Sequence, residues 1–171
     1  MLTVKSTMKT EVIYSDDKLH RLLVKRVWNP ELPSACIIML SPSSIADETS
    51  LDMTSMYVIN NCHKLGFGSV HIMNLYSKMD SASHENILEN DGLIQKVCKD
   101  CSSVILAYGT GCQTKQVLSR INTILDLLRP FQDKLFEISD GKGSGYHPLG
   151  KTVRLKWELV PFYLEKELKK A

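Results

Sequence analysis

The chain has 171 residues, of which 43% are hydrophobic and 23% are charged, and its formal net charge at pH 7 is +2. This length suits one domain with a sizeable core, the small net charge gives no bulk electrostatic reason to expect nucleic acid, and no apolar run approaches the ~20 residues that cross a bilayer. Five cysteines are an odd count that argues against a disulfide framework, and residues 1–10 lack the apolar segment of a signal peptide, so we expect a cytoplasmic protein with a single domain over residues 1–171.

The N-terminal part predicts a β-hairpin followed by a buried strand. Residues 11–14 and 20–28 are β-type runs on either side of the turn sequence Ser15-Asp16-Asp17-Lys18. After a loop that contains Pro30 and Pro33, residues 35–40 are apolar at every position. Such a continuous run is typical of a strand that is buried on both faces.

The rest of the chain alternates helices with strands. We expect helices over residues 49–64, 84–98, 113–128 and 156–169, and strands over residues 69–74, 103–107 and 135–138. Ser50 or Asp52 suits the N-cap of the first helix and Ser83 that of the second, while Pro161 would kink or start the last one. Strands and helices that alternate with short connections predict an α/β layer around a parallel sheet.

Each of the four strands expected to be parallel runs into a polar loop motif. These motifs are Ser41-Pro42-Ser43-Ser44, Asn74-Leu75-Tyr76, Tyr108-Gly109-Thr110-Gly111 and the Gly-rich stretch that ends in Tyr146-His147-Pro148-Leu149. Ligands of open parallel sheets bind just outside the carboxyl ends of the strands. The sequence therefore predicts that the four motifs gather into one site.

His147 is the strongest single candidate for that site. It lies in a Gly/Pro loop, where a histidine can donate a hydrogen bond to a developing oxyanion or transfer a proton. Lys142, Lys151 and Arg154 belong to the same stretch and would suit phosphate contacts. A solvated charged loop is the alternative interpretation of this stretch.

The other motifs offer binding groups with simpler alternatives. Asn74 carries a donor and an acceptor that could match a nucleobase edge, or it could satisfy the backbone of a turn. Ser41 and Ser43 could line a site or serve turn geometry. Asp47 and Asp52 could hold a water or a metal ion, although an Asp before an apolar periodic run more often caps a helix.

One CxxC spacing occurs, at Cys98-Lys99-Asp100-Cys101. A lone CxxC, without a second such pair or a histidine pair, lacks the four ligands that structural zinc requires. We therefore expect no metal site and no cofactor.

The order of the loop motifs resembles that of the uracil-DNA glycosylase superfamily over roughly residues 35–165. That superfamily has a Pro-containing catalytic loop, a Leu-Leu-Asn strand end, a Leu-Trp-Gly strand end and a His-Pro-Ser loop. The counterparts in this chain are Ser41-Pro42-Ser43, Met73-Asn74-Leu75, Ala107-Tyr108-Gly109 and His147-Pro148-Leu149.

A closer resemblance, over nearly the whole chain, is to an uncharacterised family of bacterial and phage proteins. The matching motifs are Trp28-Asn29-Pro30, Leu-Ser-Pro-Ser-Ser-Ile-Ala-Asp over residues 40–47, Asp52-Met53-Thr54, Gly66-Phe67-Gly68, Asn74-Leu75, Asn90-Asp91, Tyr108-Gly109 and His147-Pro148-Leu149. The chain departs from the family pattern at Ser41, where the family motif has Asn, at the additional residue Ile45, and at Tyr108, where the motif has Trp.

These resemblances imply a three-layer α/β/α fold with a four-stranded, mostly parallel sheet of the uracil-DNA glycosylase type, plus an N-terminal β-hairpin at one edge. They imply recognition of a nucleobase or nucleotide and, if the protein is an enzyme, hydrolysis of an N-glycosidic bond. His147 would hydrogen-bond a base oxygen and stabilise the departing base. Asp47, or in second place Asp52, would position the attacking water.

The remaining roles implied by the resemblance concern binding. Asn74, with Ser41 and Ser43, would read the base, and Tyr108 or Tyr57 would stack on it. Lys142, Lys151 and Arg154 would contact phosphate of DNA or of a nucleotide, and a base in duplex DNA would be flipped out. The alternative is a non-catalytic module that binds a small nucleotide or a protein partner. A carboxylate near His147 would favour the enzyme, and a site with only Ser and Asn would favour the binding module.

Overall fold

The computed structural model of the protein describes residues 1–80, 84–111 and 114–164. Its elements, in chain order, are β1 (Lys9–Tyr14), β2 (Arg21–Val27), β3 (Ser34–Met39), α1 (Met53–Lys64), β4 (Ser69–Asn74), α2 (Leu88–Asp100), β5 (Ser103–Leu106), α3 (Lys115–Leu128), the 3₁₀ helix η1 (Arg129–Lys134), β6 (Leu135–Ser139) and β7 (Glu158–Pro161). Among these residues, no helix has the length and apolarity needed to cross a bilayer.

The seven strands of the described residues belong to one mixed sheet, in the order β1-β2-β4-β3-β5-β6-β7. The neighbours among β4, β3, β5 and β6 run parallel, whereas the pairs β1/β2, β2/β4 and β6/β7 are antiparallel. The expected four-stranded, mostly parallel sheet is therefore wrong as a description of the whole sheet. Its four strands form only the centre, because the hairpin joins through β2 and an unpredicted strand, β7, closes the other side.

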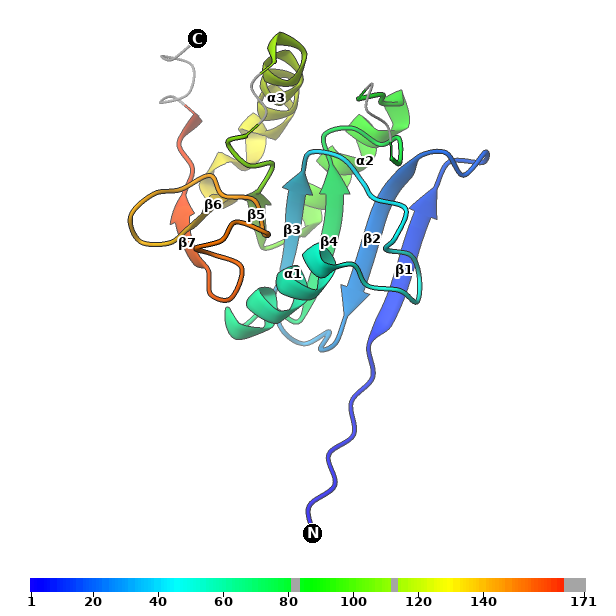
Figure 1. Cartoon of the computed structure of the whole chain (residues 1–171), viewed down its shortest axis with the longest axis vertical. Helices are drawn as coiled ribbons and strands as arrows, with labels where there is room; N and C mark the ends of the chain where they lie inside the picture. The colour runs from blue at the N-terminus through cyan, green and yellow to red at the C-terminus, as the bar shows by residue number, and fades with distance from the viewer. Residues whose placement is uncertain (81–83, 112–113, 165–171) are drawn as a thin grey trace.

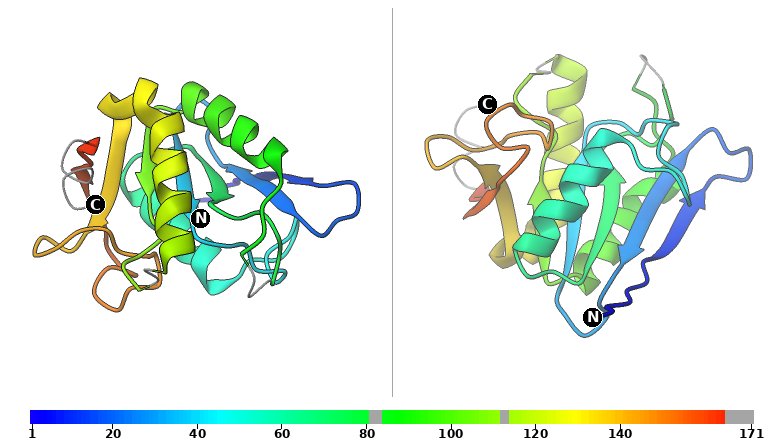
Figure 2. Two further views of the ribbon diagram at one scale, coloured as in Figure 1. Left: turned by 90° about the horizontal axis from the view of Figure 1, so that it is seen from above. Right: turned by 60° about the horizontal axis from the view of Figure 1, so that its bottom comes forward.

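Helices cover both faces of the sheet (Figures 1 and 2). Helix α1 packs on one face together with Val153 and Trp157 from the loop before β7, and α2 and α3 pack on the opposite face. Residues 35–38 of β3 are fully buried, as expected for a central strand with apolar side chains on both faces.

The C-terminal helix expected over residues 156–169 is wrong over residues 156–163, although Leu164, the last described residue, is helical. Glu158–Pro161 is strand β7, which pairs antiparallel with β6. Pro161 has no backbone N–H and is tolerated here because β7 is an edge strand. Residues 165–169 of that prediction lie outside the described part of the chain.

The other helices occur where they were expected, with later starts. Helix α1 begins at Met53, and Asp52 is its N-cap, since Asp52 Oδ1 accepts a hydrogen bond from the Ser55 N–H at 2.7 Å. Helix α2 begins at Leu88 rather than near residue 84, because His84 has a positive φ of 51° that an α-helix does not allow. The predicted cap Ser83 lies outside the described residues.

Candidate functional site

The exits of the parallel strands lie at one edge of the sheet, which we call the carboxyl edge. The Leu75 N–H donates to the Met39 carbonyl at 2.8 Å, and the Tyr76 N–H donates to the Leu40 carbonyl at 3.0 Å. These bonds hold the exit of β4 against the exit of β3. The loops that follow β3, β4, β5 and β6, over residues 40–52, 75–87, 107–114 and 140–157, all start from this edge.

His147 is half-buried beside the exit of β5. Gly109 has a φ of +80°, and a Cβ at that position would lie 3.1 Å from the His147 Cβ. The Leu149 N–H donates to His147 Nδ1 at 3.2 Å, and burial lowers the pKa of His147. The ring is therefore neutral at pH 7 with its proton on Nε2, which makes Nε2 a hydrogen-bond donor.

The carboxylate whose charge acts on His147 is Asp52, not Asp47. The negative charge of Asp52 raises the pKa of His147, whereas burial lowers it and has the larger effect. Among the contacts of the described residues, only Oδ1 of Asp52 serves the N-cap of α1. Asp47 Oδ1 instead accepts the N–H groups of Thr49 and Ser50 at 2.7 and 2.6 Å, bonds that lower its pKa. Asp47 thus stabilises its own loop.

Two buried arginines of β2 hold the loop over residues 40–52, which we call the β3–α1 loop. Arg26 donates to the carbonyls of Asp47 and Ser50 at 2.6 and 3.0 Å, and Arg21 donates to the carbonyls of Ser43, at 2.8 Å, and Ala46. The two arginines are only 5% and 3% exposed, in chain order. A guanidinium group with several donors can satisfy many loop carbonyls that would otherwise be buried without partners.

These arginines were not predicted as functional residues from the sequence. The pairing of β1 with β2 shifts register between Ile13 and Tyr14, so that Tyr14 lies opposite Arg21. Such a bulge redirects the side chains that follow it. The available signal was two arginines in a strand whose other residues, apart from Lys25, are apolar, because a charge is rarely buried without a dedicated set of partners.

Ser41 and His84 approach each other at the centre of the carboxyl edge. Ser41 Oγ lies 3.4 Å from His84 Nδ1, and the imidazole stacks on Tyr76 with ring centroids 4.9 Å apart and planes 20° apart. Tyr76 is buried and donates its hydroxyl hydrogen to the Gln116 carbonyl at 3.3 Å. Tyr76 belongs to one of the four predicted loop motifs, but neither Tyr76 nor His84 was predicted to have a role in the site.

Asn74 carries an unsatisfied donor at the end of β4. Alternate strand residues share a face, so Asn74 lies on the same face as Ile72, which is the face covered by α1. The side chain is 2% exposed, and within the described part of the chain Nδ2 has no hydrogen-bond partner. A buried donor without an acceptor is costly, so this amide is suited to an acceptor supplied from outside the protein.

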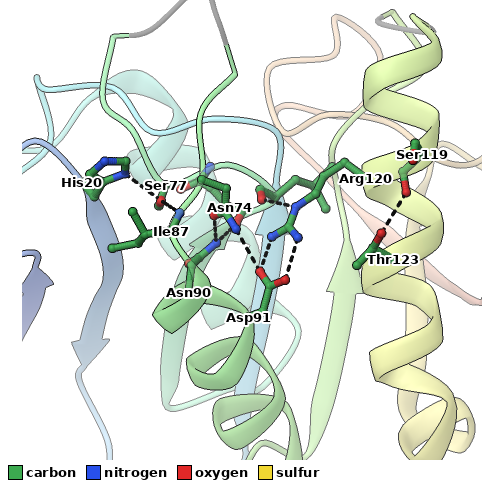
Figure 3. A network of polar contacts seen from close by, with 11 residues as sticks. His20, Asn74, Ser77, Ile87, Asn90, Asp91, Ser119, Arg120 and Thr123 are labelled. Carbon is green, nitrogen blue, oxygen red and sulfur yellow. Dashed lines mark hydrogen bonds and ion pairs between the residues drawn. The ribbon is translucent and has the colours of Figure 1, made fainter.

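A polar network behind Asn74 fixes the exit of β4 (Figure 3). Asn90 Nδ2 donates to the Asn74 carbonyl at 3.1 Å, and Arg120 Nε donates to the Leu75 carbonyl at 2.7 Å. Arg120 also pairs with both oxygens of Asp91. Helices α2 and α3 are thereby tied to the strand end that carries Asn74.

Residues 21–149 match a family whose description is "Protein of unknown function (DUF1643)". The chain belongs to this family. The family match confirms the expected membership of an uncharacterised family. Neither the search of curated proteins nor the search of solved structures gave a significant match. The part of the chain that the family shares begins at Arg21 and ends at Leu149, so it contains Asp52, Asn74 and His147 and leaves out β1 and β7.

The remaining predicted residues lie within or next to the shared family region. Tyr108 is half-buried and packs on the core beneath α2 and α3, on the opposite face from α1. Ser43 Oγ accepts the Ile45 N–H at 3.1 Å, which is a turn role. Lys142, Lys151 and Arg154 have exposed side chains in the loop over residues 140–157. Tyr57 is half-buried on α1.

Proposed function

We propose that this member of the family recognises a nucleobase or nucleotide at the carboxyl edge of its sheet and hydrolyses an N-glycosidic bond there. One observation carries the proposal: the hydrogen bond from the Leu149 N–H to Nδ1 leaves Nε2 as the donor of the neutral His147 ring, and the charge of Asp52 acts on that ring. A neutral donor and a nearby carboxylate are the two groups needed to stabilise a departing base and to orient water.

In the proposed reaction, the bond between the base nitrogen and the sugar C1′ breaks, and the base takes the electron pair. The Nε2–H of His147 donates to a base oxygen that gains negative charge. Asp52 accepts a hydrogen bond from water, whose oxygen forms the new bond to C1′. The proton released by water ends on the base. We assign the water to Asp52 rather than Asp47, because both oxygens of Asp47 already accept hydrogen bonds from its own loop.

The proposed base contacts come from the ends of the neighbouring strands. Asn74 Nδ2 would donate to a base acceptor, and Ser41 would contribute a hydroxyl from the centre of the edge. Ser43 belongs to the same loop, and Tyr57 and Tyr108 are the candidate stacking residues. Lys142, Lys151 and Arg154 would reach phosphate, since their side chains are exposed. A base within duplex DNA would have to leave the stack to reach these groups.

The test is release of base from single- and double-stranded oligonucleotides that contain uracil or modified bases. We expect His147→Ala to lower the rate about 100-fold with the fold intact, the usual loss for one donor to a developing oxyanion. Asp52→Asn should slow the reaction and Asp47→Asn should leave it nearly unchanged. Failure of the wild-type protein to release base from any of these substrates would overturn the enzymatic proposal.

A non-catalytic binding module is the second candidate. It is favoured by the residue at the centre of the carboxyl edge, Ser41, whose hydroxyl group cannot act as a carboxylate base. Such a module would bind a free nucleotide or an oligonucleotide without releasing base, or a protein. If Lys142, Lys151 and Arg154 contact phosphate, oligonucleotide affinity should fall steeply as salt rises. Affinity that stays flat with salt would argue against nucleic acid as the ligand. We also propose that the protein works in the cytoplasm.

A further inference from the structure

Residues 1–8 form an extended arm that continues the line of β1 beyond the end of β2 (Figure 1). Leu2 and Val4 are 90% and 81% exposed. In the described part of the chain, no hydrogen bond joins residues 1–8 to other residues. The arm thus exposes apolar side chains and leaves its backbone groups unpaired.

The sequence of the arm nevertheless has the pattern of a strand. Leu2, Val4 and Met8 share one set of alternate positions, which Ser6 interrupts, and the positions between them hold Thr3, Lys5 and Thr7. Alternation with period two places the apolar residues on one face. This face continues the side of β1 that carries Val12, which packs on the core beneath α1.

The outer edge of β1 is also unpaired. β1 is the first strand in the sheet order, so among the described strands it pairs only with β2. The opposite edge strand, β7, contains Pro161, which blunts an edge by removing a donor. β1 contains no proline and therefore offers a full row of backbone donors and acceptors.

The arm cannot pair with the edge of its own β1, because the two are one continuous segment. Two copies of the chain can pair the backbone of the arm and the outer edge of β1 at the same time. We propose that the protein forms a symmetric dimer in which the arm of each copy lies antiparallel on the β1 edge of the other. The interface would join the two sheets through two identical strand pairs, as a closed two-fold contact requires.

Charge complementarity selects the register. A two-fold axis perpendicular to the sheet leaves each face of the sheet on the same side in both copies. Side chains on one face therefore pair with side chains on the same face, so even-numbered residues lie opposite even-numbered ones. With the axis at Met8, Lys5 lies opposite Glu11 of the second copy, and Val4 lies opposite Val12. Moving the axis to Thr7 places Lys5 opposite Lys9, and moving it to Lys9 places two copies of Lys9 together. Opposite charges across strands stabilise and like charges destabilise, so the axis lies at Met8.

Cross-linking tests this register directly. Directly opposed residues of antiparallel strands have Cα atoms about 4.5–5.5 Å apart, which a disulfide can bridge. With Cys112→Ser as the background, we expect Met8→Cys to form a disulfide-linked dimer under mild oxidation. Ser6→Cys should not, because the two copies of residue 6 would be separated by four residues, ~13 Å along the strand. Met53→Cys, at an exposed methionine of α1, is the second control.

Light scattering after size-exclusion chromatography measures the dimer itself. We expect a dimer for the wild-type chain and a monomer after deletion of residues 2–8. Lys5→Glu should weaken the dimer by at least roughly 2- to 30-fold, since each of the two symmetric pairs becomes a like-charge pair. Lys5→Glu combined with Glu11→Lys should restore part of the affinity, because Glu11→Lys also removes the pairing of Glu11 with Lys25 of its own chain. A wild-type monomer at every concentration, or a dimer that survives the deletion, would overturn the proposal. A dimer in which Met8→Cys does not cross-link would overturn the register.

Discussion

The Leu149 N–H donates a hydrogen bond to Nδ1 of His147 at 3.2 Å, two residues away in the same loop. This short-range contact leaves Nδ1 without a proton whenever the ring is neutral. The loop over residues 140–157 therefore sets the chemical state of His147 before any ligand arrives.

The titration of His147 should distinguish Asp52 from Asp47. Burial lowers the pKa of His147, and the Asp52 charge raises it in part. We expect nitrogen NMR to show the proton on Nε2 and a pKa below that of an exposed histidine. Asp52→Asn should lower this pKa further, whereas Asp47→Asn should leave it unchanged. An equal response to both substitutions would remove the basis for choosing Asp52.

The same lowered pKa links His147 to acid sensitivity. Between the folded-state pKa and the unfolded value of about 6.5, the unfolded chain binds more protons than the folded one. The free energy of unfolding should therefore fall as the pH drops through this window. His147→Gln should flatten that part of the curve, and denaturant titrations at several pH values would measure it. Burial also lowers the pKa of His71. His71 should therefore cause a further fall in the free energy of unfolding with decreasing pH, and this fall should persist in the His147→Gln variant.

Gly109→Ala should destabilise the protein. The φ of +80° costs an L-residue about 1 kcal/mol or more, and the new Cβ would lie 3.1 Å from the His147 Cβ. Gly92→Ala is the matched control, since Gly92 lies inside α2 and an added Cβ there would have no atom within 4 Å. That control should gain about 0.5–1 kcal/mol of stability. Urea unfolding of the two variants would reveal the opposite signs.

Loss of the Asp91 charge should be far more costly than loss of the Asp126 charge. Asp91 and Arg120 have side chains that are 19% and 11% exposed, and Asp91→Asn would leave the Arg120 charge nearly buried without its partner. A cost of about 3 kcal/mol is usual for such a break. Asp126 pairs with Arg129 at the surface, so Asp126→Asn should cost under about 1 kcal/mol. Similar costs for the two substitutions would contradict the role given to the network in Figure 3.

The buried cysteines should be inert toward thiol reagents in the native protein. Burial raises the pKa of Cys62 to about 12 and is the largest of the effects that raise the pKa of Cys101 to about 11, so almost no thiolate is present near neutral pH. Mass spectrometry after alkylation should find Cys36, Cys62, Cys98 and Cys101 unmodified until denaturant is added. Rapid native alkylation of Cys98 or Cys101 would instead revive a chemical role for the CxxC spacing.

Apolar continuity made the sheet centre predictable. Strands β3 and β5 are buried on both faces beyond their first residue, and their apolar sequences predict this burial without information on the neighbouring strands. β7 was not predictable in this way, because its short sequence becomes a strand by pairing with β6 across a long loop. The charged residues around Pro161 fit a helix as well as they fit an exposed edge strand.

The candidate site was predictable only as a set of loops. The edge rule for parallel sheets placed Asn74 and His147 after strands, but the choice between Asp47 and Asp52 depends on how the β3–α1 loop folds. That conformation depends on Arg21 and Arg26, and the direction of Arg21 follows from the bulge in β2. Local sequence patterns do not reveal the direction of the Arg21 side chain, because that direction depends on the register between β1 and β2.

The contacts of Arg21 and Arg26 also link the folding of the β3–α1 loop to the docking of the β1–β2 hairpin. β2 and β1 are joined by a short turn and can pair locally, but β2 reaches the rest of the sheet only through β4. The β3–α1 loop precedes β4 in the chain and nevertheless receives its hydrogen bonds from β2. We therefore expect its native conformation to form only after the hairpin has docked on β4. Any opening that detaches the hairpin from β4 releases the loop as well, so both belong to one cooperative unit of unfolding.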